Sequence, residues 1–394
     1  MNHIVINDKY KCCGCGACLQ KCPKKAITLE YDKEGFWYPH IDKEKCVDCG
    51  LCIKVCHLLI DNYNPNETET KASYCAYNKS DEIMKDSSSG GIFWLLVEYA
   101  LSKGGVVYGA VAEGFNVFHR RGETAEECAA FRKSKYLQSD TKNTYVEAQM
   151  DLKAGRLVLY SGTPCQIAGL YSFLGKKYDN LITCEVVCHG VPSRAAFDKW
   201  LDELTQKNNG IRPVSMVWRD KVQGWGPNRI TYTFEDGHTW TCTSQENLFQ
   251  KGFLNNLYLR PSCYECKYAR LPRIADISLA DFWGYKGELK MGNDNKGLSI
   301  VILSSESAVK IFKVISCKMV KKPEDIEDIK KCSRHVWITP LTNTRRGSFF
   351  RLIEEIGFVD AAEKCLRLTV KDRVKRSFKN VYRFLCYKFI NNKS

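Results

Sequence analysis

Several features common in secreted and membrane proteins are missing from the 394-residue sequence. The chain opens without a basic segment followed by an apolar run, so no secretory signal is expected. No apolar run approaches the roughly 18 residues that a membrane-spanning helix needs. The sequence therefore predicts a cytoplasmic protein whose thiols are reduced.

Two signatures of other enzyme classes are also absent. No G-x-G-x-x-G follows an expected strand, which argues against a dinucleotide-binding Rossmann site. The spacing C-x3-C-x2-C, typical of radical adenosylmethionine enzymes, does not occur either. A radical enzyme with structural clusters is therefore disfavoured.

Net positive charge is small outside one end of the chain. The formal net charge is +14, but residues 364–394 alone hold ten Lys or Arg against one acid. The first 363 residues are therefore only mildly basic. A nucleic-acid-binding face across the body of the protein is not indicated.

Cysteine, in contrast, is abundant. The chain has 21 cysteines, and nine of them lie between Cys12 and Cys56. In a cytosolic chain such a cluster is more often metal-binding or catalytic than cross-linked. With 44% apolar and 12% aromatic residues, the chain can bury real cores, so disorder throughout is excluded.

Composition divides the chain into four parts. They are a cysteine-dense unit over 1–60, a polar linker over 61–72, an α/β domain over 73–360 and a basic tail over 361–394. Apolar and β-branched runs predict buried strands at 104–114, 156–165, 180–190 and 298–305, and a hairpin over 229–243 that turns at Asp236–Gly237. Ser193 is the expected N-cap of the helix that follows it. The predicted fold class is α+β or mixed α/β.

Two four-cysteine runs carry the clearest chemical signal. Both read C-x2-C-x2-C-x3-C, the spacing of bacterial ferredoxins with two 4Fe-4S clusters. Because the fourth cysteine of each run ligates the other cluster, we expect two ligand sets. These are Cys12, Cys15, Cys18 and Cys56, and Cys46, Cys49, Cys52 and Cys22. Zinc is the alternative, although zinc sites usually take cysteine pairs from separated segments. Cys13 is left over and is interpreted as a small packing residue.

Four other cysteines lie in suggestive places. Cys165 and Cys188 each follow an expected strand, and Cys263 and Cys266 form a C-x2-C pair. Strand ends at one edge of a sheet converge in space, so the four could ligate a third cluster. The alternative is a buried or reactive thiol at each site, because one C-x2-C is not a cluster signature.

A Ser-Gly-Gly sequence precedes the apolar segment Ile92–Lys103. Free amides at a helix start would favour a phosphate there. Ordinary N-capping by Ser88 or Ser89 explains the same pattern.

A series of motifs resembles one known family in order and spacing. The motifs are SSGGIF, FRKSKYLQSD, SGTPCQIAGL, VCHGVPS, WRDKVQGW, LRPSCYECKYA and ADISLADFWG. Together they are similar to the beta-subunit family of the coenzyme F420-reducing hydrogenases and dehydrogenases. The likeness runs from about Cys12 to about Ser305, which is most of the chain.

The resemblance implies a flavoprotein that binds FAD together with iron–sulfur clusters. It implies a ferredoxin fold followed by a larger α/β flavin-binding domain, and it favours the third cluster at Cys165, Cys188, Cys263 and Cys266. It also implies flavin contacts from Ser89, Gly90, Gly91, Lys135, Tyr136, Gly162 and Thr163. Bacterial members of this family often accompany surface-polysaccharide genes.

These features together predict an oxidoreductase that converts between one-electron and two-electron carriers. Electrons would pass from the ferredoxin-type clusters, supplied by a redox partner such as ferredoxin, through the flavin to a small organic acceptor or a deazaflavin-like carrier. The alternative is an electron-transfer subunit that serves a partner enzyme and has no substrate site of its own. Lys135 could stabilise an anionic reduced flavin, or could form a surface salt bridge. His189 and Asp281 could transfer protons, although Asp281 fits a structural anchor equally well.

The basic tail has an amphipathic pattern over residues 370–390. Apolar residues recur near helical spacing and basic residues fill the other faces. Such a segment is typical of an interfacial helix on anionic lipid, which would give peripheral membrane contact. A terminal helix packed on its own domain has the same pattern, so both interpretations stay open.

Overall fold

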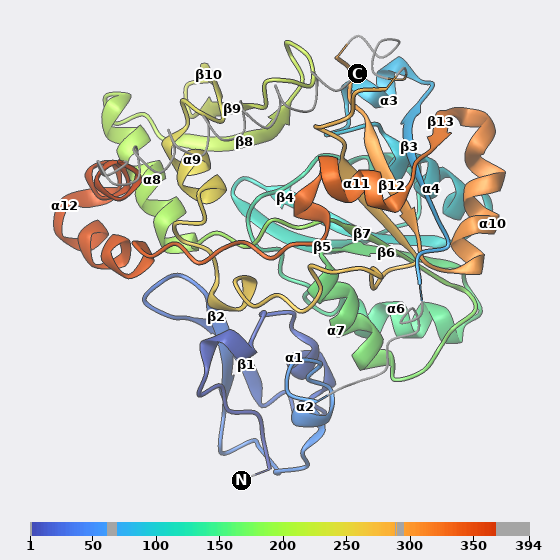
Figure 1. The fold of residues 1–394 in the computed structure, drawn as a ribbon. Coiled ribbons are helices and arrows are strands. Elements are labelled where there is room, and N and C mark those ends of the chain that lie inside the picture. Colours follow the sequence, from blue (N-terminus) through green and yellow to red (C-terminus); the bar gives the residue numbers. More distant parts are fainter. Residues whose placement is uncertain (1, 61–68, 288, 290–294, 368–394) are drawn as a thin grey trace, which may run out of the picture.

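An eight-stranded mixed sheet forms the centre of the larger part of the chain (Figure 1). The structure is a computed structural model and describes residues 2–60, 69–287, 289 and 295–367. The strand order is β13-β3-β12-β11-β7-β6-β4-β5, and β4, β6, β7 and β11 run parallel to one another. The strands are β3 (Ala72–Asn78), β4 (Val106–Glu113), β5 (Asn116–Gly122), β6 (Val158–Gly162), β7 (Leu181–Val186), β11 (Ile277–Asp281), β12 (Ser299–Leu303) and β13 (Met319–Pro323).

Both faces of this sheet are buried because its strands are apolar at successive positions. In β6, Leu159 points into one core while Val158 and Tyr160 point into the core on the opposite face. Helices α4 (Ile92–Ser102) and α10 (Glu306–Ile315) cover the Leu159 face, and α6 (Thr144–Lys153) and α7 (Pro164–Leu174) cover the other. A three-layer arrangement results. The shorter helices here are α3 (Asp81–Lys85), α5 (Ala125–Ala129) and α11 (Ile326–Cys332).

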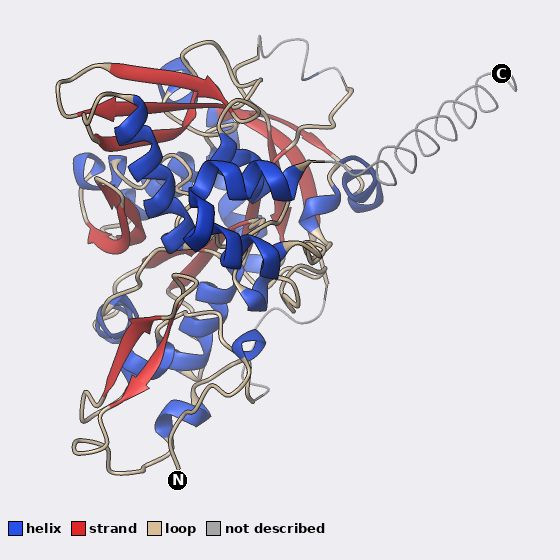
Figure 2. Ribbon diagram, turned by 90° about the vertical axis from the view of Figure 1, so that its left-hand side faces the viewer, coloured by secondary structure: helices blue, strands red, loops and turns tan. Residues whose placement is uncertain are grey.

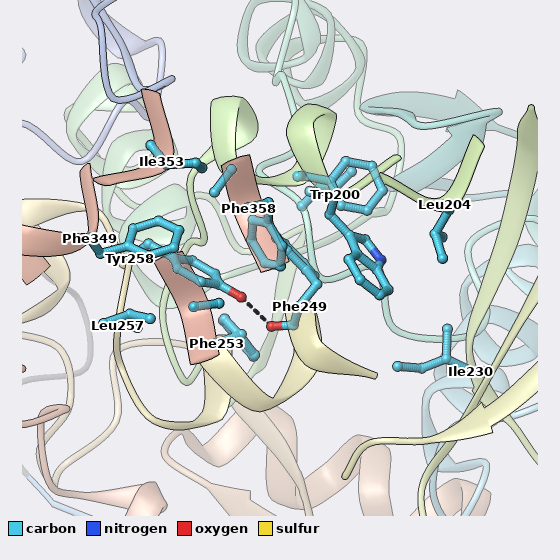
Figure 3. Close-up of a cluster of buried hydrophobic side chains, with 14 of the residues drawn as sticks. Trp200, Leu204, Ile230, Phe249, Phe253, Leu257, Tyr258, Phe349, Ile353 and Phe358 are labelled. Carbon is cyan, nitrogen blue, oxygen red and sulfur yellow. Dashed lines mark hydrogen bonds between the residues drawn. The ribbon is translucent and has the colours of Figure 1, made fainter. Parts of the chain in front are cut away.

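A second, smaller sheet of three antiparallel strands packs with three helices to form a separate helix–sheet unit. Its strands are β8 (Pro213–Asp220), β9 (Arg229–Phe234) and β10 (Thr239–Thr243), and its helices are α8 (Arg194–Lys207), α9 (Leu248–Leu254) and α12 (Arg346–Leu366). Figure 3 shows how aromatic rings from α8, α9 and α12 meet in its core. There the Tyr258 hydroxyl donates a hydrogen bond to the Phe249 carbonyl.

The N-terminal unit lies at one end of the larger body in both ribbon views (Figures 1 and 2). It contains the antiparallel pair β1 (Ile27–Tyr31) and β2 (Trp37–Ile41) and the short helices α1 (Ala17–Lys21) and α2 (Leu51–Lys54). Gly16 and Gly50 begin these helices with φ of 78° and 74°, a backbone conformation that favours glycine. Helix α1 contacts α6 and α7 of the larger body.

The structure confirms the predicted mixed α/β class and its main elements. The strands expected at 104–114, 156–165, 180–190 and 298–305 are β4, β6, β7 and β12, and the hairpin over 229–243 is β9–β10. Ser193 caps α8, since its side chain accepts a hydrogen bond from the Ala196 amide.

Capping of α4 by Ser88 or Ser89 was a wrong expectation. The N-cap is Gly91, with φ of 70° and no side-chain cap. The Ser88 hydroxyl instead accepts from the Ser134 amide, and the Ser89 hydroxyl donates to the Leu298 carbonyl. Tertiary partners therefore compete successfully for both hydroxyls.

The amphipathic helix predicted over 370–390 lies outside the described residues. Within the described residues, the end of α12 is buried in the core that α12 shares with α8, α9 and the three-stranded sheet; the buried residues there are Ala361, Ala362 and Cys365. No described helix combines the length and the apolar character needed to cross a membrane.

Replacing Phe358 by alanine should lower the free energy of unfolding by about 3–5 kcal/mol. This ring is fully buried and contacts Trp200, Phe349 and Tyr258. The matched control is Leu341→Ala, because Leu341 is 79% exposed and should cost no more than about 0.5 kcal/mol. Denaturant unfolding measures both, and equal losses would contradict the packing described above.

Candidate functional site

One predicted ligand set lines a cavity at the far end of the N-terminal unit. Cys22, Cys46, Cys49 and Cys52 all border it. The sulfur of Cys52 accepts a hydrogen bond from the Ile4 amide at 3.2 Å, and that of Cys22 accepts one from the Ala26 amide at 3.3 Å. Four thiols around one cavity, with amides directed at sulfur, fit a 4Fe-4S cluster. Cys49 is exposed, so this end of the unit reaches solvent.

The other ligand set of this unit faces the larger body. Burial, followed by the negative fields of Cys12 and Cys56, raises the pKa of Cys18. The fields of Cys18 and Cys56 also act on Cys15, so the four predicted ligands are close enough to interact electrostatically. Thiols gathered this way stay protonated unless a cation offsets their charge, which an iron cluster does.

The third cysteine set comes together from three separate segments. Cys165 lies in the first turn of α7, Cys188 follows β7, and Cys263 and Cys266 lie in and after a short 3-10 turn. Burial, and then the fields of Cys263, Cys165 and Cys266, raise the pKa of Cys188. The Val191 amide donates to the Cys263 sulfur at 3.3 Å. This donor set also suits a 4Fe-4S cluster.

Cys13 lies between the inner ligand set of the N-terminal unit and the third set. Its sulfur lies within 4.8 Å of the Cys15 sulfur and close enough to Cys165 for the two thiols to affect each other's pKa. Its sulfur is 3.6 Å from Nε2 of His57, a buried histidine. From the spacing of the cysteines, Cys13 was interpreted as a packing residue. Its position between the two ligand sets could not be predicted from that spacing.

Hydrogen bonds from the larger body hold the cysteine loop of the N-terminal unit. Gln138 donates to the Cys13 carbonyl, and Thr141 donates to the Cys15 carbonyl, both at 2.9 Å. Arg260 donates to the Cys12 carbonyl at 2.8 Å. Because carbonyls of three loop residues accept these bonds, the loop is positioned from outside. The sequence reasoning missed Arg260, whose only signal was its place three residues before Cys263.

The predicted flavin residues collect near the carboxyl ends of the parallel strands. Gly162 ends β6, and Thr163 caps α7, where its hydroxyl is 3.3 Å from the Cys165 sulfur. Lys135 lies close enough to affect His119, whose ring is about 3.5 Å from where a Cβ on Gly162 would be. Ligands of open α/β sheets bind at this edge.

The Ser-Gly-Gly segment, which follows β3, lies at the same edge of the sheet, next to β12. The Gly90 amide donates to the Ser299 hydroxyl, and a Cβ on Gly90 would lie 2.5 Å from the Ala76 carbonyl. Close packing against β3 and β12 therefore accounts for this glycine. Arg219 donates both to the Ser88 carbonyl, at 2.9 Å, and to the Tyr136 hydroxyl, at 3.3 Å, which joins the segment to Tyr136.

Lys135 is half-buried, and hydrogen bonds to backbone carbonyls take the place of the surface salt bridge of its alternative interpretation. Its amine donates to the carbonyls of Ala130 and Arg132 at 2.8 and 2.7 Å. It forms no ion pair with any residue that the structure describes. Burial lowers the pKa of Lys135 to about 7. A half-buried amine that pairs with no carboxylate of the described residues fits an anionic ligand such as a flavin phosphate or a reduced flavin ring.

His189 and Asp281 differ in how available they are for proton transfer. Asp281 pairs with Arg219 at 2.5 Å and accepts from the Trp225 indole at 3.2 Å, which agrees with a structural anchor. His189 packs edge-on against Phe253, and burial lowers its pKa.

Comparison with known families decides the class of the protein. Residues 11–58 match the 4Fe-4S dicluster domain, and residues 155–328 match the C terminus of the coenzyme F420 hydrogenase/dehydrogenase beta subunit. The segment 155–328 belongs to the F420 hydrogenase/dehydrogenase beta-subunit family. The family predicted from the motifs is thereby confirmed, and this F420 beta-subunit-like chain is an iron–sulfur electron-transfer protein of the oxidoreductase type.

Other comparisons add less. No curated protein matches the chain. A similar solved chain occurs in the F420-reducing nickel–iron hydrogenase complex from Methanosarcina barkeri, in a xenon derivative. It is 19% identical over 76% of this chain and 92% of that chain, with a TM-score of 0.46.

The low pKa of Lys135 makes a pH-dependent contribution to stability. Between about pH 7 and pH 10 the unfolded chain, with an ordinary lysine pKa of 10.5, holds more protons than the folded chain. Stability should therefore rise with pH in this window, and Lys135→Met should remove that rise. Anaerobic thermal unfolding should show the stability of the wild type, relative to that of the variant, increasing from about pH 7 to about pH 10. Lys177→Met, at a side chain 73% exposed, should follow wild type. Parallel profiles for wild type and Lys135→Met would contradict the assignment.

Proposed function

We propose that this chain carries electrons from two ferredoxin-type clusters through a third cluster to a flavin, which reduces an organic acceptor or a deazaflavin-like carrier. The observation that supports it most is the contiguity of the three cysteine sets and the flavin residues. Cys13 adjoins Cys165, and Thr163 adjoins the same cysteine at 3.3 Å. Short steps of this kind favour electron transfer over isolated structural clusters.

Each set of residues has a separate task in this proposal. The exposed Cys49 end of the N-terminal unit receives electrons from a redox partner, for which ferredoxin is our candidate. Cys165, Cys188, Cys263 and Cys266 hold the third cluster. When bound, the clusters supply one-electron transfer and the flavin supplies conversion to two-electron chemistry. Lys135 places positive charge beside the flavin, and Tyr136, packed on Trp218 at 5.7 Å, shields it from water.

FAD is the flavin that we propose, with contacts from Ser89, Gly90, Gly91, Gly162 and Thr163. The support for FAD, and for a role in surface-polysaccharide biosynthesis, is the family likeness of the motifs. The alternative function is an electron-transfer subunit without a substrate site, and the description of the matched family as a beta subunit favours it.

The cofactor content tests the proposal directly. Anaerobically purified protein should contain iron, acid-labile sulfide and flavin. Cys188→Ser or Cys263→Ser should remove about a third of the iron, since three clusters share it equally. Cys317→Ser, at an exposed cysteine outside all three sets, should keep the full amount. Protein with zinc and no flavin would refute the proposal, and an unchanged iron content in both variants would refute the third cluster.

Turnover by the isolated chain separates the enzyme from the subunit. With a chemically reduced ferredoxin as donor, an enzyme should reduce F420 or a related acceptor through many cycles. A subunit should accept electrons once per cofactor and then stop. Stopped-flow absorbance at flavin and acceptor wavelengths distinguishes a burst from steady turnover.

A further inference from the structure

Arg260 is a fully buried cation at the junction of the two bodies. Its side chain is among the largest in the protein with no exposure to solvent. Its donors reach the carbonyls of Cys12 and Trp37, both at 2.8 Å, and the Gln138 side-chain oxygen at 3.3 Å. Its guanidinium also lies 4.5 Å from the centre of the Tyr38 ring.

No carboxylate neutralises this charge among the residues that the structure describes. Other buried or half-buried arginines differ in this respect. Arg273 pairs with Glu185, Arg219 with Asp281, and Arg346 with Glu34. A buried charge that bonds only to neutral groups is costly, so an anion is expected beside Arg260.

Cysteines of two ligand sets lie next to Arg260. One guanidinium nitrogen is 3.5 Å from the Cys12 sulfur. The Cys263 amide donates a hydrogen bond to the Arg260 carbonyl at 2.9 Å, so Arg260 adjoins both the inner set of the N-terminal unit and the third set, and the fields of Cys12 and Cys263 both act on its side chain. A cluster held by four thiolates carries net negative charge, and that charge grows on reduction.

We propose that Arg260 is a positioning residue that raises the reduction potential of the cluster held by Cys12, and of the third cluster beside it. A fixed positive charge in a dry, low-dielectric junction stabilises the more negative, reduced state. Its hydrogen bond to the Cys12 sulfur acts in the same direction. Electrons are thereby drawn from the exposed end of the N-terminal unit toward the junction. For the third cluster this inference rests on the proposed function, whereas for the Cys12 cluster it needs only the dicluster domain.

The experiment is a redox titration of the anaerobic full-length protein, monitored by electron paramagnetic resonance, for wild type, Arg260→Gln, Arg260→Lys and Arg346→Gln. In Arg260→Gln, the reduced-to-oxidised ratio of the Cys12 cluster at a fixed potential should fall about tenfold, which for one electron is about 59 mV. Arg260→Lys keeps the positive charge but loses the planar guanidinium, so the reduced-to-oxidised ratio should fall less in this variant than in Arg260→Gln. The cluster of Cys22, Cys46, Cys49 and Cys52 should not shift and serves as an internal reference.

Arg346→Gln is the matched control for docking. Arg346 also joins the larger body to the N-terminal unit, but it bonds to Glu34 and its charge is compensated. If Arg260 acted only by holding the two bodies together, Arg346→Gln and Arg260→Lys would both shift the potential as much as Arg260→Gln. That result, or unchanged potentials in Arg260→Gln, would overturn the proposal. Wild-type protein without clusters would instead refute the iron–sulfur function itself.

Discussion

The junction between the cysteine loop of the N-terminal unit and the larger body is the constraint on which the rest of the structure depends. It is polar and buried, because backbone carbonyls of Cys12, Cys13 and Cys15 accept from Arg260, Gln138 and Thr141. Buried polar groups are costly unless every partner is in place. The junction therefore admits one arrangement of the two bodies, and that arrangement sets the separation of the cysteine groups.

Close packing reinforces this fixed arrangement. A Cβ on Gly169 of α7 would lie 3.1 Å from the Cys15 sulfur, so the helix that carries Cys165 approaches the loop as nearly as its backbone allows. The rate of electron transfer depends steeply on the distance between the donor and acceptor cofactors. It does not require particular side chains between them. Under the proposed function, this junction fixes the separation across which electrons would pass between two domains that differ in fold.

The sheet positions the remaining groups by its topology. Because β6, β7 and β11 are parallel, the segments that follow them meet at one edge, and there Thr163, Cys188 and Asp281 come together. The same edge receives Lys135 from the segment after α5. A half-buried lysine and a buried arginine flank the predicted path of electrons, and neither pairs with a carboxylate of the described residues. Both would stabilise added negative charge, so in the proposed path the protein environment would favour reduced cofactors at the junction and at the flavin over the exposed end of the N-terminal unit.

The sequence by itself determined the features that depend on neighbours along the chain. The eight ferredoxin cysteines lie within two short runs, so their spacing is the local geometry of a cluster loop, and it identified a dicluster domain. Strand patterns predicted β4, β6, β7 and β12 for the same reason. The tertiary structure alone decided what depends on distant partners. Ser88 and Ser89 do not cap α4, because partners 46 and 209 residues away bind their hydroxyls. Arg260 faces a cysteine 248 residues before it, and no local pattern encodes a buried charge whose partner lies in another domain.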